Sequence, residues 1–89
     1  MSFDKTEWME LLSLADDMDT TTRMLLCQYS TLFDSRGRAT TQLKVLSKAV
    51  GVTPTEVRKH LIKAKDAEWL EAIKLDGKKG YQATIPTML

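Results

Sequence analysis

Side chains that could bind phosphate are concentrated in the second part of this 89-residue chain. Residues 36–89 contain eleven lysines and arginines against five acidic residues, a net charge of +6, whereas residues 1–35 carry a net charge of −5. The overall charge of +1 hides this asymmetry. Clustered cations bind nucleic-acid phosphates, although scattered lysines that only solvate a surface explain the charge equally well. The charge distribution therefore makes nucleic acid a candidate partner for residues 36–89.

The composition gives little support to catalysis or metal binding. The chain has one cysteine, Cys27, and one histidine, His60, which together form neither a metal-ligand set nor a catalytic triad. No glycine-rich phosphate loop precedes a helix in a βαβ pattern. We therefore expect no enzyme activity, no catalytic residue, no metal and no cofactor. The sequence also shows no membrane span and no signal peptide, so we expect a cytoplasmic protein of a bacterium or a phage-infected cell.

The clearest local signal is a helix start at Thr53. Thr53 is a good N-cap, Pro54 suits the first helical position, and Glu56 completes a capping box. The apolar period then predicts a helix over residues 54–67. Its core face is formed by Val57, Leu61 and Ala64.

A second helix is expected directly before this one. Its apolar pattern stops at Gly51, where a left-handed residue can end a helix, and Thr40 or Thr41 can cap its start. Two helices joined by a short turn that contains glycine form a helix-turn-helix. The stretch over residues 43–70 is therefore expected to be the centre of the fold.

These residues resemble the winged helix-turn-helix domains of bacterial and phage or plasmid regulators. Residues 67–70, Ala-Glu-Trp-Leu, are similar to the e-a-G-W-L pattern that ends the recognition helix, and residues 34–38 are similar to a D-x-x-G-R link. The resemblance covers about residues 20–86. It implies a mainly helical α+β fold with a three-helix core, a C-terminal hairpin called the wing, and here an extra N-terminal helix.

The wing is expected over residues 74–81. Alternating runs at residues 69–75 and 81–85 flank a turn at residues 76–80, and Pro86 stops the second strand. Lys78 and Lys79 lie in this turn, where they could contact backbone phosphates. Lysines in hairpin turns often have no such role, and only their place beside a helix-turn-helix favours it.

The resemblance also implies which side chains contact DNA. In this fold the start of the recognition helix enters the major groove, which makes Thr55, Glu56, Arg58 and Lys59 candidates for base edges. Arg58 could pair with guanine and Glu56 with cytosine, although Glu56 also serves the capping box. The complete predicted set is Arg36, Arg38, Thr41, Gln42, Thr53, Thr55, Glu56, Arg58, Lys59, Lys63, Lys78 and Lys79.

Two side chains fit the pattern less well. Ile62 points away from the core face, so it should meet the wing, the leading helix, a partner or a thymine methyl group. Glu68 stands where the family usually has the glycine that ends the helix. The sequence therefore does not determine where this helix ends or at what angle the wing leaves it.

Residues 1–18 are expected to form a separate element before the domain at residues 19–89. An amphipathic helix over residues 3–17 either packs on the domain core or provides a surface for a partner or a second copy. Its predicted dimer-interface residues are Trp8, Met9 and Leu12. A further helix is expected over residues 20–33.

The function that follows from the resemblance is sequence-specific binding of double-stranded DNA. The first interpretation is a small phage or bacterial transcription regulator, with a second copy of the chain as a candidate partner. An origin-binding replication accessory protein is an alternative. A third is a protein-interaction module, such as an adaptor or antirepressor acting through its acidic N-terminal part, because fold alone does not determine function.

Overall fold

Apolar faces of four helices and one small antiparallel sheet meet in a common core in the computed structural model, which describes residues 3–86. The helices are α1 (Lys5–Ser13), α2 (Thr20–Ser30), α3 (Leu43–Val50) and α4 (Pro54–Asp66). The strands are β1 (Arg38–Thr40), β2 (Leu70–Leu75) and β3 (Lys78–Ala83). The expected mainly helical α+β class is therefore confirmed. No helix among these residues is long and apolar enough to cross a membrane.

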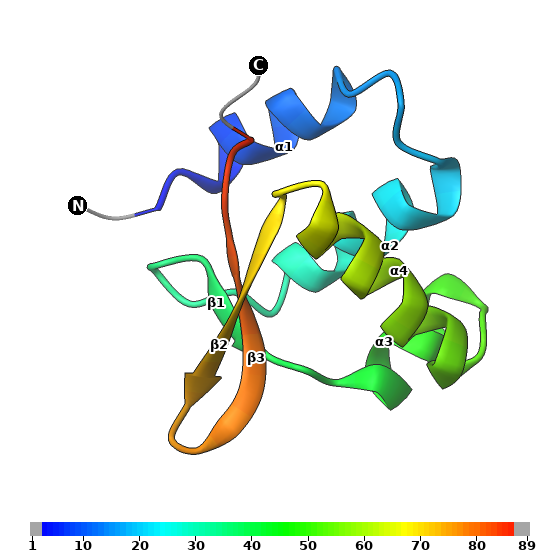
Figure 1. The fold of residues 1–89 in the computed structure, drawn as a ribbon, viewed down its shortest axis with the longest axis vertical. Coiled ribbons are helices and arrows are strands. Elements are labelled where there is room, and N and C mark those ends of the chain that lie inside the picture. Colours follow the sequence, from blue (N-terminus) through cyan, green and yellow to red (C-terminus); the bar gives the residue numbers. More distant parts are fainter. Residues whose placement is uncertain (1–2, 87–89) are drawn as a thin grey trace.

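Helices α2, α3 and α4 pack against one another on one side of the molecule, and the strands lie on the other side (Figure 1). Leu61 and Val57 of α4 and Leu25 and Leu26 of α2 are buried in this core. The hydroxyl of Tyr29, also in α2, donates a hydrogen bond of 2.6 Å to the carbonyl of Ala39 in β1. The core thus connects the helices to the sheet.

The predicted turn between α3 and α4 is confirmed. Gly51 follows α3 in the left-handed conformation, with φ 82° and ψ 28°. Thr53 caps α4, because its hydroxyl oxygen accepts the backbone N–H of Glu56 at 3.2 Å. The hydroxyl of Ser47 donates to the carbonyl of Val52, which ties α3 to the turn. These local contacts determine where α4 begins and in which direction it runs.

The end of α4 retains the geometry of a glycine-ended helix without the glycine. Glu68 adopts a left-handed conformation with φ 68°. Its N–H bonds to the carbonyl of Lys65 at 3.0 Å, and the N–H of Trp69 bonds to that of Ala64 at 2.9 Å. This pair of bonds is the Schellman motif. The chain therefore reverses into β2 at the position where the family pattern has glycine.

The strands form one sheet in the order β1-β3-β2. Strands β2 and β3 are a hairpin in which Leu75 pairs with Lys78, so its loop is only Asp76 and Gly77. Both residues have positive φ, 52° and 80°, as a two-residue type I′ turn requires. The expected five-residue turn over residues 76–80 was therefore too long. The second strand begins at Lys78 instead of Tyr81 because Asp-Gly closes the hairpin by itself.

Strand β1 was not predicted. Its three residues contain one apolar side chain, Ala39, which is too little to produce a periodic pattern. The strand pairs with β3, where Ala39 lies opposite Tyr81 and Thr40 opposite Gly80. Gly80 therefore lies within a strand, in close backbone contact with the carbonyl oxygen of Ala39.

Helix limits also differ from expectation. Helix α1 spans Lys5–Ser13 instead of residues 3–17. Helix α2 ends at Ser30 instead of residue 33. The N–H groups of Leu32 and Phe33 bond to carbonyls three residues before them, instead of four as in an α-helix. Helix α3 is preceded by Gln42 as N-cap, without a side-chain cap bond. Thr41 does not cap it; its N–H instead bonds to the carbonyl of Lys79 at 3.0 Å.

Helix α1 is part of the same core, which corrects the prediction that Trp8 and Leu12 form a dimer interface. Both side chains are fully buried in the chain's own core. The Trp8 ring packs edge-on against Trp69, with centroids 6.4 Å apart, and its Nε1 donates to the carbonyl of Thr84 at 2.9 Å. Met9 is only partly buried. Helix α1 therefore packs into the same core as the later elements.

Candidate nucleic-acid interface

A groove of about 1200 Å³ separates α4 from the β2–β3 hairpin. One end is formed by residues 40–43, which lead from β1 into α3. One wall comes from α4 through Arg58, Leu61 and Ile62, and the other from strand residues 72–74 and 78–81. The hairpin extends away from the helices (Figure 1).

Four cationic side chains line this groove. Arg58 comes from α4, and Lys74, Lys78 and Lys79 come from the hairpin. Within residues 3–86, none of the four makes an ion pair with a carboxylate. Lys74 and Lys79 lie directly opposite each other on the paired strands. Like charges in that relation destabilise a hairpin, and a bound anion would remove the repulsion.

The floor of the groove is largely apolar. Leu61 is buried, Leu43, Ile73 and Tyr81 are partly buried, and Ile62 is exposed. Burial raises the pKa of the Tyr81 phenol, while the nearby charge of Arg58 lowers it. The net shift is upward, so Tyr81 is neutral near pH 7 and its hydroxyl can donate a hydrogen bond. The groove thus combines a cationic rim with an apolar floor.

Five residues of the predicted set come together in the groove, namely Thr41, Gln42, Arg58, Lys78 and Lys79. The prediction omitted Lys74, although it placed this residue at the start of the hairpin. Strand alternation with a two-residue turn would have identified Lys74, because that register sets it opposite Lys79. The assumed longer turn concealed this pairing.

Four predicted residues lie at the exposed start of α4, outside the groove lining. Thr53, Thr55, Glu56 and Lys59 are all exposed. Thr53 and Glu56 are joined by the N-cap hydrogen bond described above. Thr55 and Lys59 share one helix face with Arg58, because positions three and four apart lie next to each other on a helix.

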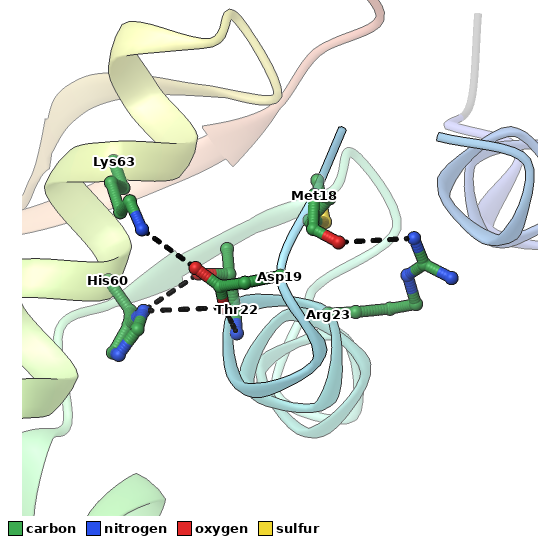
Figure 2. Close-up of polar contacts among 6 residues, drawn as sticks. All are labelled: Met18, Asp19, Thr22, Arg23, His60 and Lys63. Carbon is green, nitrogen blue, oxygen red and sulfur yellow. Dashed lines mark hydrogen bonds and ion pairs between the residues drawn. The ribbon is translucent and has the colours of Figure 1, made fainter. Parts of the chain in front are cut away.

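Lys63 lies apart from the groove and contacts α2 instead. Its Nζ is 2.7 Å from Oδ2 of Asp19, the N-cap of α2, as Figure 2 shows. This ammonium, with the backbone N–H of Thr22, holds the pKa of Asp19 well below its usual range. His60 Nδ1 shares a hydrogen bond of 2.7 Å with the Thr22 hydroxyl and lies 3.8 Å from Asp19 (Figure 2). Lys63 therefore belongs to a contact between helices and not to the groove.

Arg36 and Arg38 also lie outside the groove lining. The carboxylate of Asp34 accepts the backbone N–H groups of both residues, at 2.8 and 3.0 Å, and Arg38 Nη2 lies 3.0 Å from it. The backbone N–H of Arg38, followed by that of Arg36, lowers the pKa of Asp34. Asp34 therefore holds the loop that leads into β1 and pairs with one of the two predicted cations.

Residues 3–86 contain no group of three or more histidine, cysteine, aspartate or glutamate side chains that could hold a metal ion. The groove brings four cationic side chains together, so the ligand that suits it is an anion. No protein-family model, curated protein or solved structure matches this chain.

Proposed function

We propose that this protein binds double-stranded DNA as a winged helix-turn-helix domain. Helix α4 is the recognition helix, and the β2–β3 hairpin is the wing that contacts the sugar-phosphate backbone. The observation that carries the proposal is that Arg58 and the hairpin lysines, which are 16 to 21 positions apart in sequence, line the same open groove.

The arrangement of elements supports this assignment. Helices α2, α3 and α4 pack as a three-helix unit, α3 and α4 are joined by a short turn, and a hairpin follows directly. A DNA major groove, about 12 Å wide, admits one α-helix. The exposed face of α4 that carries Thr55, Arg58 and Lys59 would then meet the base edges, as the resemblance implies.

The lysines of the hairpin support binding to the backbone. Lys74 and Lys79 repel each other across the strands, and a phosphate between them would offset this repulsion. Contacts of this kind supply affinity for any DNA sequence, whereas contacts to base edges supply specificity. Arg58 is the proposed guanine-reading residue, since its fork-shaped guanidinium can bond both acceptors of a guanine edge. A role in transcription regulation, or in replication, follows from the family resemblance.

Selection of bound sequences from a random duplex pool tests the proposal directly. The selected duplex should then show strong salt dependence, because four cations at phosphates predict about a 10²-fold loss of affinity between 50 and 200 mM salt. The symmetry of the selected sequence would show whether one copy binds or two. Failure to enrich any sequence, together with salt-independent weak binding, would contradict the proposal.

Three variants separate the assigned roles. Arg58→Ala should relax sequence preference and weaken binding by about 1–3 kcal/mol. Lys79→Glu should weaken binding to all duplexes while stabilising the free hairpin by about 0.2–1 kcal/mol, because it places opposite charges across the strands. Lys63→Gln is the control for Arg58→Ala, because both remove one positive charge, and it should leave affinity nearly unchanged since Lys63 lies apart from the groove.

A protein-interaction module is the second candidate. Leu14, which is 73% exposed, and Met24, which is 50% exposed, offer apolar surface outside the groove. Leu14 is close in sequence to the acidic residues Glu10, Asp16 and Asp17. A module of this kind would bind DNA weakly at any salt concentration, so the same titration distinguishes the two functions.

A further inference from the structure

Ile62 lies on the face of α4 that the proposed function directs toward DNA. Its side chain is 42% exposed and lines the groove together with Arg58. It follows Thr55 by seven positions and Arg58 by four, so all three lie on the same exposed face of the helix. An isoleucine therefore continues the row of side chains that begins at the start of α4.

Single exposed apolar residues are common and need no explanation by themselves. The surroundings of Ile62 distinguish it, because the groove that it lines contains both cationic side chains such as Arg58 and apolar ones such as Ile73. A polar base edge placed against Ile62 would lose hydrogen bonds to water without gaining a partner. In the major groove, the apolar group of a standard base edge is the C5-methyl group of thymine.

We infer that Ile62 is a specificity-determining residue that packs against a thymine methyl group, beside the guanine read by Arg58. This inference rests on the proposed function. Four helical residues span about 6 Å, and base pairs follow one another at about 3.4 Å. The thymine should therefore lie one or two base pairs from the guanine position whose preference is lost in Arg58→Ala.

Deoxyuridine is the probe for this contact, because it differs from thymidine only in lacking the C5-methyl group and keeps the same hydrogen-bonding groups. Each thymine of the selected duplex is replaced in turn, and affinity is measured by fluorescence anisotropy. One replacement, at the predicted distance from the guanine, should weaken binding about fourfold, as expected for one buried methyl group.

The variant Ile62→Ala should bind the thymine duplex and that deoxyuridine duplex equally well. Leu14→Ala is the matched control, since it also shortens an exposed apolar side chain but lies outside the groove lining. It should retain the fourfold preference for thymine. Circular dichroism verifies that both variants are folded.

The outcomes separate this inference from the function on which it rests. If the protein selects no duplex, the proposed function fails and the inference fails with it. If the protein selects a duplex but every thymine-to-deoxyuridine replacement is neutral, the function stands and the inference is overturned. An unchanged thymine preference in Ile62→Ala also overturns it.

Discussion

At the residue scale, Glu68 carries backbone strain that a glycine would not have. Its φ of 68° lies in the left-handed region, where a side chain costs about 1–2 kcal/mol. Glu68→Gly should therefore raise the free energy of unfolding by about 0.5–1 kcal/mol, after the greater chain entropy of glycine in the unfolded state is subtracted. Urea unfolding measures this change.

The control for this substitution lies in the neighbouring strand. Glu71 is an exposed residue of β2, and Glu71→Gly should lower stability by about 0.5–1 kcal/mol, because glycine there gains nothing from its conformational freedom. Equal destabilisation by both substitutions would show that the left-handed conformation of Glu68 carries no strain.

Asp19 makes the free energy of unfolding depend on pH in the acidic range. Its pKa is lower in the folded chain than in the unfolded chain, mainly because Lys63 Nζ lies 2.7 Å from its carboxylate. The unfolded chain therefore takes up the proton first as pH falls. The stabilising contribution is complete above about pH 4 and decreases as the pH falls further, through the folded pKa.

The variant Asp19→Asn isolates this effect. Asparagine is as good an N-cap as aspartate, so α2 keeps its cap while the ion pair with Lys63 is lost. Compared with the unmodified protein, the variant should be less stable at pH 7 and should lose less of its stability between pH 5 and pH 2. Urea unfolding across this range checks the prediction, which an identical loss in both proteins would contradict.

At the element scale, the position of β1 depends on the missing side chain of Gly80. A Cβ added there would overlap the backbone carbonyl oxygen of Ala39 and lie 3.0 Å from Thr40 Cα. Backbone atoms cannot move aside as a flexible side chain does, so Gly80→Ala should lower stability by about 1–3 kcal/mol. Gly77→Asn should cost less than about 0.5 kcal/mol, because asparagine tolerates the turn conformation and the space around Gly77 is open.

Thermal unfolding of the two variants measures this difference. The same contact holds residues 40–43 at the end of the groove, since they continue directly from β1. Gly80→Ala should therefore also weaken the proposed DNA binding in the fraction that remains folded. Equal stabilities of Gly80→Ala and Gly77→Asn would mean that β1 can move away from β3 at little cost.

At the scale of the whole molecule, Trp8 connects α1 to the rest of the core. It packs against Phe33 and Trp69, with ring centroids 5.5 and 6.4 Å away, and bonds to the carbonyl of Thr84. Trp8→Ala should therefore cost about 3–5 kcal/mol, which is a large part of the stability of a domain of this size. Urea unfolding measures the loss.

Sedimentation of Trp8→Ala distinguishes a core role from an interface role. Replacing a core residue lowers the free energy of unfolding without changing the number of copies that associate. Replacing an interface residue changes that number. Leu14→Ala, on the exposed end of α1, should change stability by less than about 0.5 kcal/mol. If Trp8→Ala converts a dimer into a monomer and leaves the free energy of unfolding unchanged, Trp8 is an interface residue.

Several features of this protein follow from the sequence by itself. The start of α4 at Thr53 and Pro54 and the left-handed Gly51 before it were predicted correctly. The energies that determine them act within a few residues, through caps and backbone conformation, so a short stretch of sequence carries the necessary information. The mainly helical α+β class was implied by the resemblance that these local motifs carry.

Other features depend on contacts between distant residues, which no local pattern specifies. The ion pair between Lys63 and Asp19 spans 44 positions, and the bond from Trp8 to Thr84 spans 76. Whether a lysine lines a groove or pairs with a carboxylate, and whether a tryptophan lies on the surface or in the core, depends on how the helices pack. Packing also brings Arg58 against the hairpin and makes the groove. Only the tertiary structure decided these points, because burial and charge pairing depend on every element that surrounds a residue.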